Sequence, residues 1–347
     1  MKSTPLIGKL LFALVGRARN YAAMMVFLGR ALLRSRELGV VQDNTGQIRK
    51  GDILLFCTLR NEAFRIPHFL EHYRRLGVGH FVFVDNGSED CFQELVRNEV
   101  DISVWHSTAS YKRANFGMHW LNYLLRRYGS GHWCVVCDPD EYLVFPYSDQ
   151  RNLYELCGYL DDERRQSFFC LLLDMYSDRA VNDTHYDADR SPLAVCPYFD
   201  ASGYVQRINT RVFNVWVQGG VRRRVIFRDN PSAAPALNKT PLVKWKWNYS
   251  YISSMHALVP RHLNVPHHGS YLCPTGCLLH FKFFSVLQEK AAEEQVRKEH
   301  FMDSLEYSHY NSHTSTDYQP MTYEGSVRYE GWKQLVRLGL MNIGKWF

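Results

Sequence analysis

The run Ile53-Leu-Leu-Phe-Cys57 has the length and apolar character of a buried β-strand, and the polar turn Thr58-Leu-Arg-Asn-Glu62 follows it directly. The same arrangement returns in His80-Phe-Val-Phe-Val84, which leads into Asp85-Asn-Gly-Ser-Glu-Asp90. A buried strand that ends in a polar turn and precedes a helical pattern is the repeating unit of an α/β sheet.

Helical patterns separate these strand-like runs. Apolar positions recur at intervals of three and four between residues 64 and 76, and residues 91–98 and 116–128 show shorter patterns of the same kind. Ile102–His106 and Trp133–Cys137 are further strand-like runs. The alternation predicts an α/β fold with a mostly parallel, doubly wound sheet, which binds its ligands beyond the carboxyl ends of the strands.

Polar turns follow three of the predicted strands, at residues 58–62, 85–90 and 138–141, where this class of sheet has its binding site. Together they contain at least five carboxylates. Carboxylates that converge on one pocket repel each other, so they usually hold a divalent cation. Neither a GxGxxG dinucleotide motif nor a GxxxxGKS phosphate loop is present. The pattern therefore predicts a metal site at this edge of the sheet.

The three turns resemble motifs of the family 2-like glycosyltransferases, which have the GT-A fold. The resemblance implies a Rossmann-like, nucleotide-binding mixed sheet with helical N- and C-terminal appendages. Asp138-Pro-Asp-Glu141 resembles their DxD motif, in the branch where an acidic residue follows the second Asp. Thr58–Glu62 resembles the turn after their first strand, and Asp85–Asp90 resembles the turn after their second strand. The resemblance covers about residues 52–285, and the three motifs in this order are more specific than DxD alone.

The resemblance implies a metal-dependent, inverting hexosyltransferase that moves a sugar from a nucleotide-sugar donor to a glycan, lipid-linked or small acceptor. Mn²⁺ or Mg²⁺ would stabilise the leaving diphosphate as a Lewis acid. By resemblance, Asp140 would bind the metal and Asp138 would bind the metal or the ribose. His280, at the end of an apolar run, would be a third metal ligand, with His256 as the alternative.

The same resemblance implies a donor-binding set drawn from the first two turns and from two basic residues of the second half. These residues are Thr58, Arg60, Asn61, Glu62, Asp85, Asn86, Arg222 and Lys239, in addition to Asp138. Asp85 would read the base, although it could instead cap its own turn. Arg222 and Lys239 could instead be solvated charges on a surface hairpin.

An inverting enzyme needs a carboxylate base for the acceptor hydroxyl. The usual Glu-Asp signature for that base is not evident in this sequence. Asp174 is the candidate because it follows the predicted strand at residues 168–173, and Asp178 is the alternative. Glu141 is a second catalytic candidate, either beside the metal or at the acceptor.

Composition limits the function classes. The chain has 347 residues, of which 46% are apolar and 22% are charged, as in folded proteins, and its net charge is +6. That charge is too small and dispersed to indicate nucleic acid. The nine cysteines are scattered through apolar runs, which favours a reducing, cytoplasmic compartment. Cys134-x-x-Cys137 is interpreted as part of a buried strand, and the late His/Cys cluster from His267 to His280 matches no standard zinc finger.

Three regions are expected along the chain. Residues 1–50 are basic and amphipathic, residues 51–285 form the catalytic domain, and residues 286–347 form a helical tail with a loop. Within the catalytic domain, residues 51–141 would bind the nucleotide sugar and residues 142–285 the acceptor. The N-terminal region is predicted as a helix pair that either lies on the anionic inner face of a membrane or packs on protein.

Two other functions are compatible with parts of this pattern. A sugar nucleotidyltransferase would need a glycine-rich nucleotide loop, and Thr58–Glu62 contains no glycine. A non-catalytic, membrane-associated glycan-binding protein would have little reason to keep Asp138 and Asp140.

Overall fold

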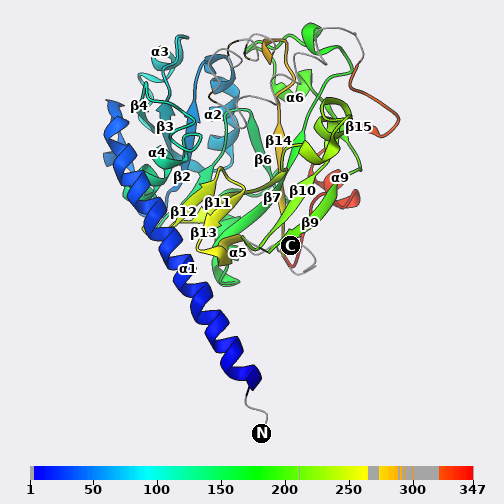
Figure 1. The fold of residues 1–347 in the computed structure, drawn as a ribbon. Helices are drawn as coiled ribbons and strands as arrows, with labels where there is room; N and C mark the ends of the chain where they lie inside the picture. Colours follow the sequence, from blue (N-terminus) through cyan, green and yellow to red (C-terminus); the bar gives the residue numbers. More distant parts are fainter. Residues whose placement is uncertain are drawn as a thin grey trace.

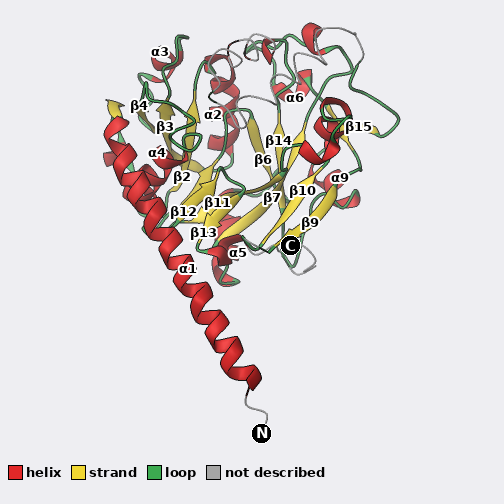
Figure 2. Cartoon of the chain, in the orientation of Figure 1, coloured by secondary structure: helices red, strands yellow, loops and turns green. Residues whose placement is uncertain are grey.

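A nine-stranded mixed sheet forms the centre of the protein in a computed structural model, with helices on both of its faces (Figures 1 and 2). The structure describes residues 4–210, 212–264, 273–287, 290, 293, 299 and 320–346, with only the backbone for residues 4–15 and 17. The strand order is β1-β4-β3-β2-β5-β11-β7-β14-β6. The strands are β1 (Gly39–Gln42), β2 (Ile53–Leu59), β3 (Val78–Asp85), β4 (Ile102–His106), β5 (Trp133–Val136), β6 (Glu141–Val144), β7 (Ser167–Asp174), β11 (Asn238–Lys244) and β14 (Gly276–His280).

The remaining described elements surround this sheet. Three two-stranded ribbons are β8 (Tyr198–Asp200) with β15 (Ser326–Arg328), β9 (Val205–Asn209) with β10 (Asn214–Gln218), and β12 (Ser250–Ser253) with β13 (Ala257–Val259). The α-helices are α1 (Thr4–Arg34), α2 (Ile66–Arg75), α3 (Phe92–Val96), α4 (Met118–Leu124), α5 (Leu153–Asp162), α6 (Pro192–Val195) and α9 (Trp332–Arg337).

The predicted α/β class is confirmed, and the four strands and three helices predicted between residues 53 and 137 are all present. Strands β4, β3, β2 and β5 pair in parallel, as expected. The whole sheet is mixed, as the predicted fold class implies, because the second half of the chain adds antiparallel pairings. There, β11 runs antiparallel to both β5 and β7, and β14 is parallel to β7 but antiparallel to β6.

Both faces of the sheet are buried, which explains why its strands are continuous apolar runs rather than alternating ones. In β2, Leu55 and Cys57 face the layer that includes α2, α3, α5 and α9, whereas Leu54 and Phe56 face the layer that includes α4. The prediction for the CxxC pair is confirmed: Cys134 and Cys137 are buried free thiols at β5. Burial raises the pKa of both thiols well above the usual value.

The N-terminal region differs from the predicted helix pair, because α1 is one continuous helix of 31 residues. The basic spacers do not interrupt it, and a glycine such as Gly16 costs a helix only about 1 kcal/mol. Its second half packs on the domain through Met24, Leu28 and Ala31, which are buried. Its first half projects beyond the rest of the protein (Figure 1). None of the helices in the described part of the chain is both long and apolar enough to cross a membrane.

The C-terminal expectations are tested only in part. Most of the charged helix predicted at residues 285–305, and the loop predicted from residue 307 up to residue 319, lie outside the described residues, as do His267 and His268. Within the rest of the predicted loop, residues 326–328 form β15, which pairs with β8. The sequence also predicts a short amphipathic helix at residues 332–340, and the structure confirms it as α9.

Candidate functional site

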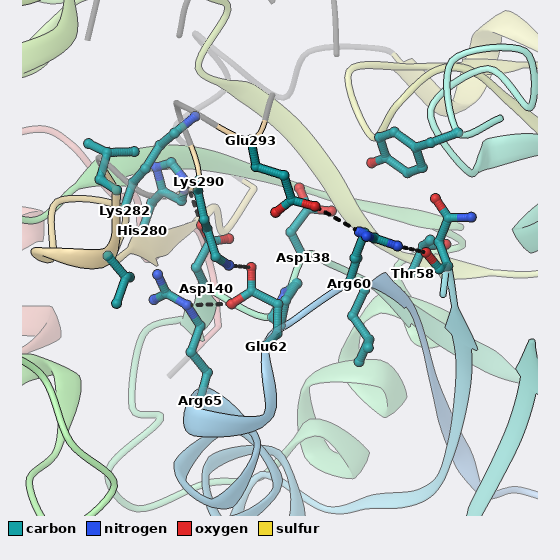
Figure 3. Close-up of a pocket in the computed structure, with 16 residues that line it drawn as sticks. Thr58, Arg60, Glu62, Arg65, Asp138, Asp140, His280, Lys282, Lys290 and Glu293 are labelled. Atoms are coloured by element: carbon teal, nitrogen blue, oxygen red, sulfur yellow. Dashed lines mark hydrogen bonds and ion pairs between the residues drawn. The ribbon is translucent and has the colours of Figure 1, made fainter. Parts of the chain in front are cut away.

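A pocket opens at the carboxyl ends of β2, β3, β5 and β14 (Figure 3). Seven of the predicted site residues line it, namely Thr58, Arg60, Glu62, Asn86, Asp138, Asp140 and His280. The other predicted residues lie elsewhere: Asn61, Asp85, Glu141, Asp174, Arg222 and Lys239 are not among the lining residues. They form hydrogen bonds and ion pairs, several of them directly with the residues of the pocket wall.

His280 is the link between the pocket and the protein interior. It is the last residue of β14, in register with Glu141 of β6 and Asp174 of β7. Its Nε2 lies 3.3 Å from Asp140 Oδ2, and its Nδ1 lies 2.6 Å from Asp174 Oδ1. Burial alone would lower the pKa of His280, but the two carboxylates raise it to about 9. Burial would raise the pKa of Asp140, and His280 together with Arg65 instead lowers it well below its usual value.

Asp174 has contacts that differ from those of a general base. Its Oδ1 contacts His280 Nδ1, its Oδ2 accepts a hydrogen bond from Arg222 Nε at 2.9 Å, and its side chain is buried. Burial would raise its pKa, but Arg222 and His280 lower it below the usual value. Because both oxygens have partners and neither faces the pocket, Asp174 is placed to orient His280. The alternative base, Asp178, is exposed.

Arg222 and Lys239 are buried, so the alternative of solvated hairpin charges is wrong for both. Lys239 Nζ lies 2.9 Å from Glu141 Oε1 and 3.6 Å from Asp138 Oδ2. Burial raises the pKa of Glu141, and the Lys239 ammonium opposes that rise. Lys239 lies where the register of β11 shifts against β7, two residues before Pro241, which cannot donate to the sheet. The buried pair thus supports Asp138 from behind the pocket.

The first two turns divide into lining and supporting residues. Asp85 is fully buried, and its two oxygens accept hydrogen bonds from the Ser88 backbone N–H at 2.8 Å and from Gln93 Nε2 at 2.7 Å. These contacts match the alternative of a residue that caps its own turn, and Asp85 does not line the pocket. Asn61 links the turns, because its Oδ1 accepts from the Glu89 N–H and its own N–H donates to Ser88 Oγ.

Asn86, next to Asp85, does line the pocket. Its Nδ2 donates to the carbonyl oxygens of Ser107 at 2.8 Å and Ala109 at 3.0 Å, which fixes the loop that follows β4. Tyr111 of that loop also lines the pocket. Thr58, at the end of β2, is buried, and its Oγ1 has no hydrogen-bond partner among the described residues. The hydroxyl oxygen is itself buried, so a ligand could bond to it only if the Thr58 side chain turned toward the pocket.

Cations line the same pocket as the carboxylates (Figure 3). Glu62 pairs with Arg65 Nε at 2.7 Å and with Lys290 Nζ, and Arg60 Nε lies 3.1 Å from Glu293. Lys282, two residues after His280, also lines the pocket. Sequence reasoning missed Arg65, Tyr111, Lys282, Lys290 and Glu293. The position of Lys282 just beyond the predicted strand end was the one available signal for this group.

The residues present fit a divalent cation only in part. Among the described residues, no three His, Cys, Asp or Glu side chains surround a single point. Asp140 and His280 are 3.3 Å apart, close to the roughly 3 Å between adjacent ligands of an octahedral ion with bonds of about 2.1 Å. Asp138 lines the same pocket, and its side chain is 40% exposed. His256, the alternative ligand, lies elsewhere, with its Nδ1 2.6 Å from the Asn238 carbonyl oxygen.

Comparisons with known proteins give only weak similarities. No protein-family model and no curated protein matches the chain. A solved mannosyltransferase from Pyrobaculum calidifontis, in complex with GDP-Man and Mn²⁺, is 21% identical with a TM-score of 0.28, over 46% of each chain. A 4-diphosphocytidyl-2C-methyl-D-erythritol synthase is 14% identical with a TM-score of 0.26, over 38% of this chain and 63% of its own. Both matches leave more than a third of those chains uncovered, and similarity this low assigns no activity.

Proposed function

We propose that the protein is a metal-dependent, inverting glycosyltransferase of the GT-A type that transfers a hexose from a nucleotide-sugar donor to a glycan, lipid-linked or small acceptor. One observation supports this most directly. A carboxylate–histidine pair and four cations line a single pocket at the carboxyl ends of parallel strands. A diphosphate bound to a divalent ion needs both kinds of group, because the ion requires oxygen and nitrogen ligands and the phosphates require cations.

The proposed metal ligands are Asp138, Asp140 and His280, with Mn²⁺ or Mg²⁺ as the ion. Bound there, the ion would act as a Lewis acid on the leaving diphosphate. Arg65 and Lys282, which lower the pKa of Asp140 together with His280, are placed to offset phosphate charge next to it. The nucleoside would be held by Thr58, Asn86 and Tyr111, the neutral polar residues of the pocket wall.

Asp174 and Arg222 act in this proposal as positioning residues. A neutral histidine carries one ring proton, and a carboxylate at Nδ1 selects the tautomer that leaves Nε2 available to a metal. The pair of short contacts from Asp174 to His280 and Arg222 provides that arrangement. Glu141 and Lys239 have the corresponding role for Asp138. The protein would work next to an anionic membrane when its acceptor is lipid-linked.

The test of this function is donor turnover. A panel of nucleotide sugars, incubated with Mn²⁺, should release nucleoside diphosphate with at least one donor, and Asp140→Asn should reduce that release by a hundredfold or more. Asp189→Asn, at an exposed carboxylate outside the pocket, is the matched control and should behave as the unmodified protein. Absence of metal-dependent turnover with every donor would contradict the proposal.

A further inference from the structure

The outward side of α1 is an exposed apolar surface. Five large apolar residues of this helix are 48–63% exposed, namely Tyr21, Met25, Val26, Leu32 and Leu33. At 100° per residue they fall within about 140° of the helix circumference, beside the side that holds the buried residues Met24, Leu28 and Ala31. We call these five residues the outer strip. A monomeric protein rarely exposes a continuous apolar surface of this kind without a partner.

The chain extends this surface past the end of the helix. Val40 and Val41 belong to β1, the edge strand of the sheet, and are 62% and 47% exposed. An edge strand with exposed apolar side chains is normally protected by charges or by a covering element. The outer strip and these two valines are close in sequence, separated by residues 34–39, and both expose apolar side chains.

The charged residues of α1 indicate which kind of partner covers this surface. The first acidic residue of the chain is Glu37, whereas Lys2, Lys9, Arg17, Arg19, Arg30, Arg34 and Arg36 all precede it. Glu37 is itself occupied, since it pairs with Arg34 and accepts a hydrogen bond from Trp120 Nε1 at 2.9 Å. Arg19, Arg30 and Arg34 fall within about 60° of each other on one flank of the outer strip. An apolar strip with a cationic flank fits an anionic lipid surface, in which the helix lies parallel to the bilayer.

A second copy of the chain is a poorer cover, because two such helices would bring their arginine-rich flanks together without acidic partners. The free first half of α1 favours a lipid surface as well. A helix of 31 residues is about 46 Å long, much more than docking on α4 requires.

We propose that the outer strip, Val40 and Val41 form a membrane-docking surface that seats the protein on an anionic bilayer, with the arginine flank at the phosphate groups. This surface is distinct from the pocket and does not depend on the proposed function. It adds a location to that function, because α1 leads into the edge strand β1, which is connected to the pocket. Gly39 of β1 pairs with His106 of β4, and the carbonyl oxygen of the next residue, Ser107, accepts a hydrogen bond from Asn86 of the pocket wall. A lipid-linked acceptor could then approach along the bilayer surface.

Vesicle flotation of the full chain tests the proposal. The protein should float with phosphatidylcholine vesicles that contain phosphatidylglycerol, and less with phosphatidylcholine alone. Leu32→Gln/Leu33→Gln should weaken binding about tenfold or more, because two exposed leucines lose their burial in lipid. Val205→Gln/Ile208→Gln on β9, which removes exposed apolar area at the opposite side of Figure 1, is the matched control and should bind normally.

Charge provides a second, independent arm. Arg19→Gln/Arg30→Gln should weaken binding to the anionic vesicles by about fivefold per residue at low salt. Equal loss in the leucine pair and its control would overturn the proposal, and so would no binding to anionic vesicles by the unmodified protein. Light scattering tests the alternative that a second copy of the chain covers the outer strip. A stable dimer that does not bind lipid, and that Leu32→Gln/Leu33→Gln converts to a monomer, would support that alternative and overturn the proposal.

Discussion

Asp174→Asn separates two roles for this carboxylate beside His280. As a positioning residue, Asp174 holds His280 Nδ1 at 2.6 Å and is itself fixed by Arg222 at 2.9 Å. Loss of a group that orients a metal-binding histidine typically weakens metal affinity by about 10–100-fold, or about 1.4–2.7 kcal/mol. As a general base, Asp174 would instead affect turnover and leave metal binding unchanged.

The effect of Asp174→Asn on folding stability has to be separated from its effect on metal affinity. The Asn variant takes a carboxylate away from the buried Arg222 guanidinium, which should lower the free energy of unfolding by about 3 kcal/mol. Asp174→Asn/Arg222→Met removes the buried arginine charge as well and should recover much of that loss, measured by urea unfolding. The Mn²⁺ dissociation constant of the double variant, measured by calorimetry, should stay raised. Mn²⁺ affinity equal to that of the unmodified protein in both variants would refute the positioning role.

Three further predictions follow from buried groups. Lys239→Met should lower the free energy of unfolding by about 3 kcal/mol at neutral pH, because the buried Glu141 loses its partner. Adding Glu141→Gln to this variant should restore most of the lost stability, measured by urea unfolding. Thr58→Val should leave stability unchanged or higher, because its hydroxyl has no described partner, yet should weaken nucleoside diphosphate binding about five- to tenfold in calorimetry. Burial lowers the pKa of His119 to about 4, so on acidification the unfolded chain binds a proton at His119 before the folded chain does. The free energy of unfolding should therefore fall by up to about 3 kcal/mol from pH 6.5 to pH 4. His119→Gln should flatten that part of the pH dependence, measured by urea unfolding.

The parallel half of the fold is predictable from the sequence because its information is local. Ile53–Cys57 and His80–Val84 are buried on both faces, so each is an uninterrupted apolar run, and the turns that follow them must lie at one edge of the sheet. The antiparallel half depends on pairings between distant segments. The residues of Asn238–Lys244 do not indicate that this segment pairs between β5 and β7, and Pro241 within it is atypical of a central strand.

The same distinction explains the site. Thr58, Asn86, Asp138 and Asp140 follow strands, so their place at the pocket is set locally. The ion pairs of Asp174 with Arg222 and of Glu141 with Lys239 join residues between 48 and 98 positions apart, and only the sheet register brings them together. Asp85 shows the opposite difficulty: the turn motif located it correctly, but whether its carboxylate faces the pocket or its own turn depends on Ser88 and Gln93.

The central claim is that one pocket binds a diphosphate through a divalent ion on Asp138, Asp140 and His280. Calorimetry of nucleoside diphosphates against the full chain, with Mn²⁺ and with a chelator, tests it directly. We expect at least one diphosphate to bind only when Mn²⁺ is present, and we expect Asp140→Asn to abolish that binding while the chain stays folded. Binding that is unaffected by the chelator, or that survives Asp140→Asn, would contradict the account.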